Sequence, residues 1–88
     1  MTRWQLEYDP AAKKELAKLD KTKALQVAEY LNEVCKLEDP ASRGHSMTGP
    51  LAGLHRYQLG QLRILVKIKR NIVTVFVLSI GRRDTIYK

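Results

Sequence analysis

The chain has 88 residues, 28% of them charged, and a net charge of +7. This length fits a single domain over residues 1–88, near the lower limit for folding without disulfides or metals. One cysteine excludes an intrachain disulfide, no apolar run is long enough to span a bilayer, and the N-terminal residues lack the apolar core of a signal peptide, so we expect a soluble cytoplasmic protein.

The first half of the chain predicts one strand and two helices. Residues 3–8 alternate between polar and apolar side chains, which indicates a half-buried strand. Asp9 and Pro10 are typical of a helix start, and this helix runs to about Leu19. A second helix runs from Lys21 to about Glu38, with an apolar stripe made of Ala24, Val27, Ala28, Leu31, Val34 and Cys35. We expect Cys35 to be a core residue rather than a nucleophile.

The second half predicts a loop and three strands. Residues 41–53 contain Gly44, Pro50 and Gly53 and should form a loop, in which His45 is a solvated side chain. No other histidine, cysteine or acid stands at metal-ligand spacing from His45, so we expect no metal site and no cofactor. Strands are predicted over 54–59, 62–69 and 72–80, with turns at 60–61 and 70–71 and a break at Gly81.

These elements give the order β-α-α-β-β-β and the α+β class. The last three strands form an antiparallel meander, and the first strand completes the antiparallel sheet at one edge. Both N-terminal helices should pack on one face of this sheet.

The positive charge belongs to the strand-rich half. Residues 1–42 carry a net charge of −1, and residues 43–88 carry +8. A one-sided basic surface indicates a polyanionic partner, either nucleic acid or an acidic protein segment. The alternative is a solvated basic face without a ligand.

Strand periodicity places part of this charge on one face of the sheet. If residues 60–61 form a two-residue turn, Gln58 lies opposite Arg63, and Arg56 lies diagonally from Arg63 at about 7–8 Å. All three then point away from the apolar face, which carries Tyr57, Leu59, Ile64, Val66 and Ile68. The two arginines repel each other, and a phosphate held by their planar guanidinium groups would offset that repulsion. The alternative is two separate solvated side chains.

The C-terminal residues Arg82, Arg83 and Tyr87 follow the last strand. A tyrosine beside two arginines suits a stacked base next to a bound phosphate. The alternative is a frayed basic terminus.

These patterns resemble the RelE/ParE toxin superfamily of bacterial and archaeal toxin–antitoxin systems. The similar strings are Leu54-His55-Arg56-Tyr57, Leu62-Arg63-Ile64-Leu65, and Val77-Leu78-Ser79-Ile80-Gly81-Arg82-Arg83 followed by Tyr87. The resemblance implies a RelE-like, microbial-RNase-like fold. The ending resembles the RelE branch, whose members cleave mRNA in the ribosomal A site, whereas the ParE branch poisons gyrase and generally lacks this ending.

The resemblance also implies roles for individual residues. Arg63 matches the arginine that holds the scissile phosphate, Arg83 the arginine that supports the leaving group, and Tyr87 the tyrosine that orients the substrate. Arg56 and Arg82 match basic positions that bind RNA phosphate, although many members have His or Lys in place of Arg82. Gln58 belongs to the same implied phosphate-binding set. It stands where the family usually has Lys or Arg, a residue implicated in activating the 2′-hydroxyl or binding phosphate, and glutamine cannot act as a base at neutral pH.

The implied protein is therefore the toxin of a type II toxin–antitoxin system. It would be a ribosome-dependent mRNA endoribonuclease that promotes attack by the 2′-hydroxyl without a metal, through alignment and charge stabilisation. Its partners would be a RelB-like antitoxin in a hetero-oligomer, the ribosomal A site and mRNA. Two alternatives stay open: a non-catalytic, ParE-like gyrase inhibitor, and an attenuated or inactive toxin retained as an antitoxin-binding partner.

Overall fold

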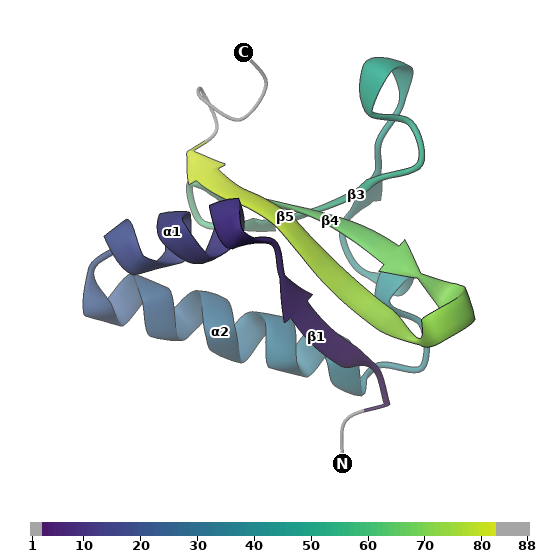
Figure 1. Ribbon diagram of the computed structural model, residues 1–88, viewed down its shortest axis with the longest axis horizontal. Helices are drawn as coiled ribbons and strands as arrows, with labels where there is room; N and C mark the ends of the chain where they lie inside the picture. The colour runs from purple at the N-terminus through teal and green to yellow at the C-terminus, as the bar shows by residue number, and fades with distance from the viewer. Residues whose placement is uncertain (1–2, 83–88) are drawn as a thin grey trace.

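The computed structural model describes residues 3–82, with the side chain of Arg82 excepted. Its helices and strands are β1 (Gln5–Tyr8), α1 (Pro10–Lys18), α2 (Lys21–Lys36), β2 (His45–Ser46), β3 (His55–Leu59), β4 (Leu62–Lys69) and β5 (Thr74–Arg82). Three short 3-10 helices connect them: η1 (Pro40–Ser42), η2 (Gly49–Leu51) and η3 (Arg70–Ile72). The predicted α+β class is confirmed (Figure 1).

Both predicted helix starts are confirmed by their caps. The Asp9 carboxylate accepts a hydrogen bond from the Ala11 N–H, and Pro10 takes the first helical position. The Asp20 carboxylate accepts from the Lys23 N–H at the start of α2. Each cap satisfies a backbone donor that the first helical turn cannot satisfy by itself.

The sheet has five strands in the order β1-β5-β4-β3-β2. β3, β4 and β5 form the expected antiparallel meander, and β1 lies at one edge as predicted. However, β1 pairs in parallel with β5, so the sheet is mixed rather than antiparallel. No hairpin links these two strands, and residue periodicity does not encode the direction of a strand at an edge.

Two predicted boundaries of β5 were wrong. Gly81 does not break the strand, because it pairs with Arg63 and the ladder continues to Arg82, whose backbone pairs with Leu62. The strand begins at Thr74 rather than at residue 72, because η3 occupies the turn. Val73 takes a positive φ there, at 50°.

A further difference is a strand inside the predicted loop. Residues His45 and Ser46 pair with Arg56 and His55 and extend the sheet beyond β3. A two-residue strand shows no measurable periodicity, so the sequence pattern could not reveal it.

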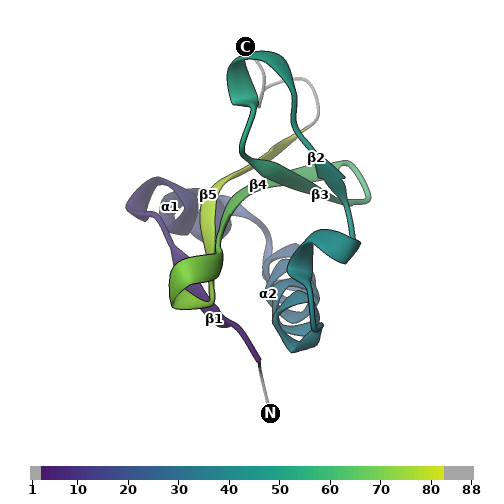
Figure 2. The ribbon, with the colours of Figure 1, turned by 90° about the vertical axis from the view of Figure 1, so that its right-hand side faces the viewer.

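The core lies between the helices and one face of the sheet. Both helices lie on the same side of the sheet, and the loop that contains η2 rises from the other side (Figures 1 and 2). The buried core side chains are Trp4, Ala12, Val27, Leu31, Val34, Cys35, Tyr57, Leu62, Ile64, Val66, Val75, Val77 and Ile80. Cys35 is 1% exposed, and burial raises the pKa of its thiol, so its predicted core role is confirmed. Within residues 3–82, no helix has the length and apolar character needed to cross a membrane.

Candidate nucleic-acid interface

The face of the sheet that the helices leave uncovered carries a row of basic side chains, and we call it the open face. Gln58 pairs with Arg63, and Arg56 pairs with Leu65, so these four residues share one side of the sheet. Residues of β4 alternate, which puts Lys67 and Lys69 on the same side. The structure therefore brings together three of the predicted site residues, Arg56, Gln58 and Arg63.

Arg56 and Arg63 lie partly buried along this face. Leu65 sits directly across from Arg56, follows Arg63 on the same side of β4, and is only 8% exposed. The Nε atom of Arg56 is itself buried and donates no hydrogen bond to any described residue. A buried donor without a partner costs about 1–3 kcal/mol, and an anion bound at this arginine would accept from it.

Gln58 is exposed beside Arg63. Its amide nitrogen donates a weak hydrogen bond to the Gly60 carbonyl oxygen, 3.3 Å away. This contact turns the amide toward the hairpin. The Gln58 side chain brings to the open face neither a positive charge nor a base that could take up a proton.

The other end of the face is also basic. The Lys69 ammonium lies 4.4 Å from the centroid of the Phe76 ring, a cation–π contact that holds it over the sheet. Within residues 3–82, the acid on this side is Glu7 of the edge strand β1, which pairs with Phe76 of β5. Among the described side chains, the open face thus carries the cations Arg56, Arg63, Lys67 and Lys69 against this carboxylate.

The open face includes a residue to which the sequence assigned no role. His45 pairs directly with Arg56, so its side chain lies on the open face, and it is exposed. Cβ atoms of such a pair lie about 4.5–5.5 Å apart. The prediction of a solvated histidine in a loop missed this position, because β2 is too short to show a pattern.

The segment that leads into β2 is tied to β3 by two side-chain hydrogen bonds. The Tyr57 hydroxyl donates to the Pro40 carbonyl oxygen at 2.7 Å, and burial raises the pKa of this phenol, which keeps it a donor. The His55 ring bonds to the Arg43 carbonyl oxygen. Together these contacts fix the chain just before it enters β2.

The remaining predicted site residues belong to the chain end. The backbone of Arg82 closes β5 opposite Leu62, and Arg83 and Tyr87 lie outside the described residues. β5 ends beside Arg63, because Gly81 is the ladder partner of Arg63. The chain therefore leaves the sheet next to the arginine that the sequence assigned to the scissile phosphate.

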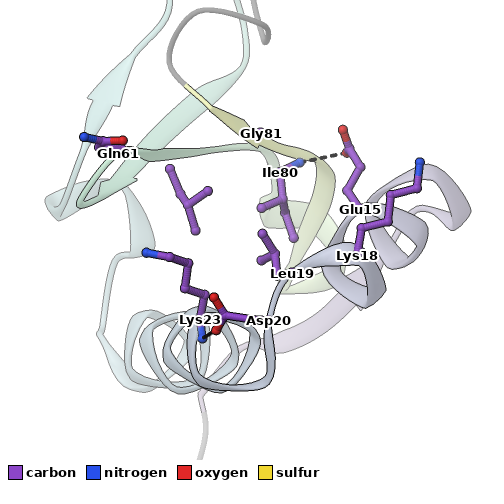
Figure 3. Close-up of a pocket in the computed structure, with 9 residues that line it drawn as sticks. Glu15, Lys18, Leu19, Asp20, Lys23, Gln61, Ile80 and Gly81 are labelled. Atoms are coloured by element: carbon purple, nitrogen blue, oxygen red, sulfur yellow. Dashed lines mark hydrogen bonds between the residues drawn. The ribbon is translucent and has the colours of Figure 1, made fainter.

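A cavity of about 430 Å³ lies on the helix side of the sheet (Figure 3). Its lining residues are Glu15, Lys18, Leu19, Asp20, Lys23, Gln61, Leu62, Ile80 and Gly81. The Glu15 carboxylate accepts from the Ile80 N–H at 2.9 Å. The two acids in the lining balance its two lysines, so this cavity suits a polyanion less well than the open face. Among the described residues, no group of three or more His, Cys, Asp or Glu side chains could hold a metal ion.

Comparison with known protein families shows to which family this protein belongs. A family model described as the ParE toxin of the type II toxin–antitoxin system parDE matches residues 6–87. The chain belongs to this toxin family. A comparison with curated proteins found no match.

Solved structures place this toxin in the RelE-like branch of the superfamily. In the RelBE2 toxin–antitoxin complex of Mycobacterium tuberculosis, the similar chain gives a TM-score of 0.84 at 24% identity, with 94% of each chain covered. In the intact E. coli RelBE complex, the similar chain gives a TM-score of 0.73 at 25% identity, with 90% of this toxin and 95% of the relative covered. The isolated E. coli RelE toxin gives a TM-score of 0.73 at 26% identity, with 90% of this toxin and 83% of the relative covered. The predicted superfamily and branch are confirmed, and the protein is a toxin of a type II toxin–antitoxin system.

Proposed function

We propose that this toxin is a ribosome-dependent mRNA endoribonuclease that inhibits translation. The observation that carries the proposal is the placement of Arg56 and Arg63 on one open face of the sheet, at the point where β5 ends. Like charges so close together repel, and a phosphate between them reverses the sign of that interaction. The E. coli RelE relatives support the same activity class by family likeness.

The reaction needs only the substrate's own nucleophile. The 2′-oxygen forms a bond to the adjacent phosphorus and loses its proton, the bond from phosphorus to the 5′-oxygen breaks, and the 5′-oxygen takes up a proton. The products carry a 2′,3′-cyclic phosphate and a 5′-hydroxyl. Arg63 holds the scissile phosphate and stabilises its developing charge, because a guanidinium remains protonated throughout. Arg56 and Gln58 position the neighbouring backbone.

The C-terminal residues complete this proposal. Arg83 supports the charge of the leaving 5′-oxygen, Tyr87 stacks on a base, and Arg82 binds a flanking phosphate. The mRNA substrate would lie in the ribosomal A site. The toxin accordingly acts in the cytoplasm, and residues 1–88 serve as one toxin domain.

The proposed protein partner is a RelB-like antitoxin. The relatives from M. tuberculosis and E. coli were solved as toxin–antitoxin complexes. An antitoxin segment with acidic side chains would cover the open face and block RNA, so the inactive form is a hetero-oligomer.

The test is induction of the toxin followed by primer-extension mapping of cellular mRNA. Wild type should create new 5′ ends within codons, and Arg63→Ala should abolish them. Arg63→Lys keeps the charge but loses the planar fork, so it should retain only a small part of the activity. Arg3→Ala removes the same charge from an exposed N-terminal position and should cleave like wild type. Equal cleavage by Arg63→Ala and wild type would refute the assignment of the site.

A second candidate function is gyrase inhibition without catalysis. The description of the matching family as ParE favours it, and so does the absence of a base at Gln58. The same experiment separates the two functions, because growth arrest without new mRNA ends would support the gyrase inhibitor. An attenuated toxin would give neither strong arrest nor strong cleavage.

A further inference from the structure

We propose that His45 is the catalytic base of RNA cleavage by this toxin, an inference that rests on the proposed endoribonuclease function. The 2′-hydroxyl must lose its proton as it attacks phosphorus. Arg56 and Arg63 cannot accept a proton, and Gln58 cannot accept one at neutral pH. Histidine is the side chain suited to this task near neutral pH.

The register of the sheet puts His45 in the required place. His45 lies directly across from Arg56, and therefore diagonally from Gln58, at a spacing of about 7–8 Å or less. On the far side of Gln58 stands Arg63. The four side chains surround one patch of the open face, so a phosphate held by the arginines brings its neighbouring 2′-hydroxyl within reach of the imidazole.

Other described groups on this face are poorly placed for the same task. Glu7 is the carboxylate on this side, but it lies on β1, two strands away from the β4 strand that carries Arg63. Lys67 and Lys69 follow Arg63 toward the opposite end of β4. His45 is thus the described proton acceptor that adjoins the arginine pair.

The backbone around His45 is built to hold it. Gly44 packs against the backbone of Arg56, where no Cβ would fit, and lies close to the Tyr57 ring. Tyr57 and His55 anchor the preceding residues by their bonds to Pro40 and Arg43. A side chain that only needs solvent requires no such support, whereas a catalytic group must be held in a fixed position.

The second histidine, His55, lies on the opposite face of the sheet from His45. His55 is 5% exposed, points to the helix side, and packs edge-on against Tyr57 with ring centroids 5.2 Å apart. It positions the β2 segment and cannot meet RNA. His45 pairs with Arg56, the residue after His55, so it lies on the other face of the sheet and is exposed there.

The step balances without a co-reactant other than water. The imidazole of His45 takes the 2′-hydroxyl proton while the 2′-oxygen bonds to phosphorus. The bond from phosphorus to the 5′-oxygen breaks, and that oxygen leaves with the electron pair and takes a proton from water. The imidazolium then returns its proton to solvent.

The test measures single-turnover cleavage of an mRNA on programmed ribosomes by purified toxin. His45→Ala and His45→Gln should each lower the rate about 100-fold or more, the range typical of a lost general base, while binding to the ribosome is unchanged. Added imidazole should restore part of the rate to His45→Ala, which leaves space for it, but not to His45→Gln or Arg63→Ala. Ser46→Ala changes the same exposed strand on the other face and should cleave like wild type.

Each other outcome counts against the proposal in a distinct way. A His45→Ala rate within about threefold of wild type shows that the side chain is not the base. A lower rate with weaker ribosome binding and no rescue by imidazole shows a phosphate-binding role instead. If wild type arrests growth but cleaves no mRNA, the endoribonuclease proposal fails and takes this inference with it. The His45 variants have an exposed side chain removed, so an unchanged thermal midpoint confirms that they fold.

Discussion

Gly44 packs so closely against Arg56 that a Cβ atom on the glycine would collide with the Arg56 carbonyl oxygen. The same Cβ would lie 2.9 Å from a ring carbon of Tyr57. Gly44 also has a φ of +73°, which other residues rarely adopt. This contact brings the short strand β2 against β3 and sets the position of His45 on the open face.

Gly44→Ala should therefore destabilise the toxin by about 2 kcal/mol or more, because backbone must move to admit the methyl group. Gly49→Ala is the matched control, since Gly49 has a φ of +66° and a methyl group added to it would meet no atom within 4 Å. It should cost only about 1 kcal/mol from backbone strain. Urea unfolding of both variants measures the difference, and equal losses would show that close packing at Gly44 is unimportant.

Asp39 should make stability depend on pH in the acid range. Its carboxylate accepts from the Ala41 N–H at 3.0 Å and from Arg70 at 3.1 Å, and these contacts, the first above all, lower its pKa below the usual 3.8. A folded-state pKa below the unfolded value gives stability that is present above the unfolded pKa and is lost as pH falls through the folded one.

The stability advantage of wild type over Asp39→Asn should thus shrink as pH falls below about 4, because protonation removes the charge that the asparagine variant already lacks. Urea midpoints at neutral pH and at about pH 3 measure this change. Arg70→Gln removes the contributions of the guanidinium and keeps the Ala41 contact, which is the largest single cause, so it should retain part of the pH dependence. A constant difference between wild type and Asp39→Asn at all pH values would contradict the linkage.

The open face shows what a sequence can predict and where this fails. The short turn between β3 and β4 sets their register, and the alternation of side chains then places Arg56, Gln58 and Arg63 on one side. That prediction depends only on strand geometry. His45 was missed because its strand has two residues and is held by distant contacts, the bonds of Tyr57 and His55 to the preceding segment.

The prediction of an antiparallel strand at the edge of the sheet was wrong for a related reason. The direction of β1 relative to β5 depends on how the chain returns to β1 after five other helices and strands, and no local pattern records that path. The break expected at Gly81 rested on the weak strand propensity of glycine. Pairing with Arg63 outweighs that propensity in β5.

Val73 should be a site where a polar residue stabilises the toxin. It is 43% exposed and has a φ of 50°, which is costly for a β-branched side chain. Asparagine tolerates this conformation, so Val73→Asn should gain about 1 kcal/mol by removing strain. Ile72→Asn is the control, because Ile72 is 52% exposed and lies in the same turn without a positive φ. Thermal unfolding of the two variants should separate them, and equal shifts would mean that strain at Val73 is negligible.

Gln58 should limit the cleavage rate. It stands directly across from Arg63, and its amide is turned to the Gly60 carbonyl oxygen. Gln58→Lys adds a cation where phosphate charge develops, so it should raise cleavage about tenfold and increase growth arrest. In a His45→Gln background it should restore part of the lost activity, because a lysine can also take part in proton transfer.

Gln61→Lys is the matched control, since it adds the same charge at the exposed turn next to the cavity on the helix side. It should leave the cleavage rate unchanged. An equal gain from Gln61→Lys would show a general effect of charge on ribosome binding. No gain from Gln58→Lys or Gln58→Arg would contradict the attenuated-toxin alternative, because the glutamine would then not be what limits this site.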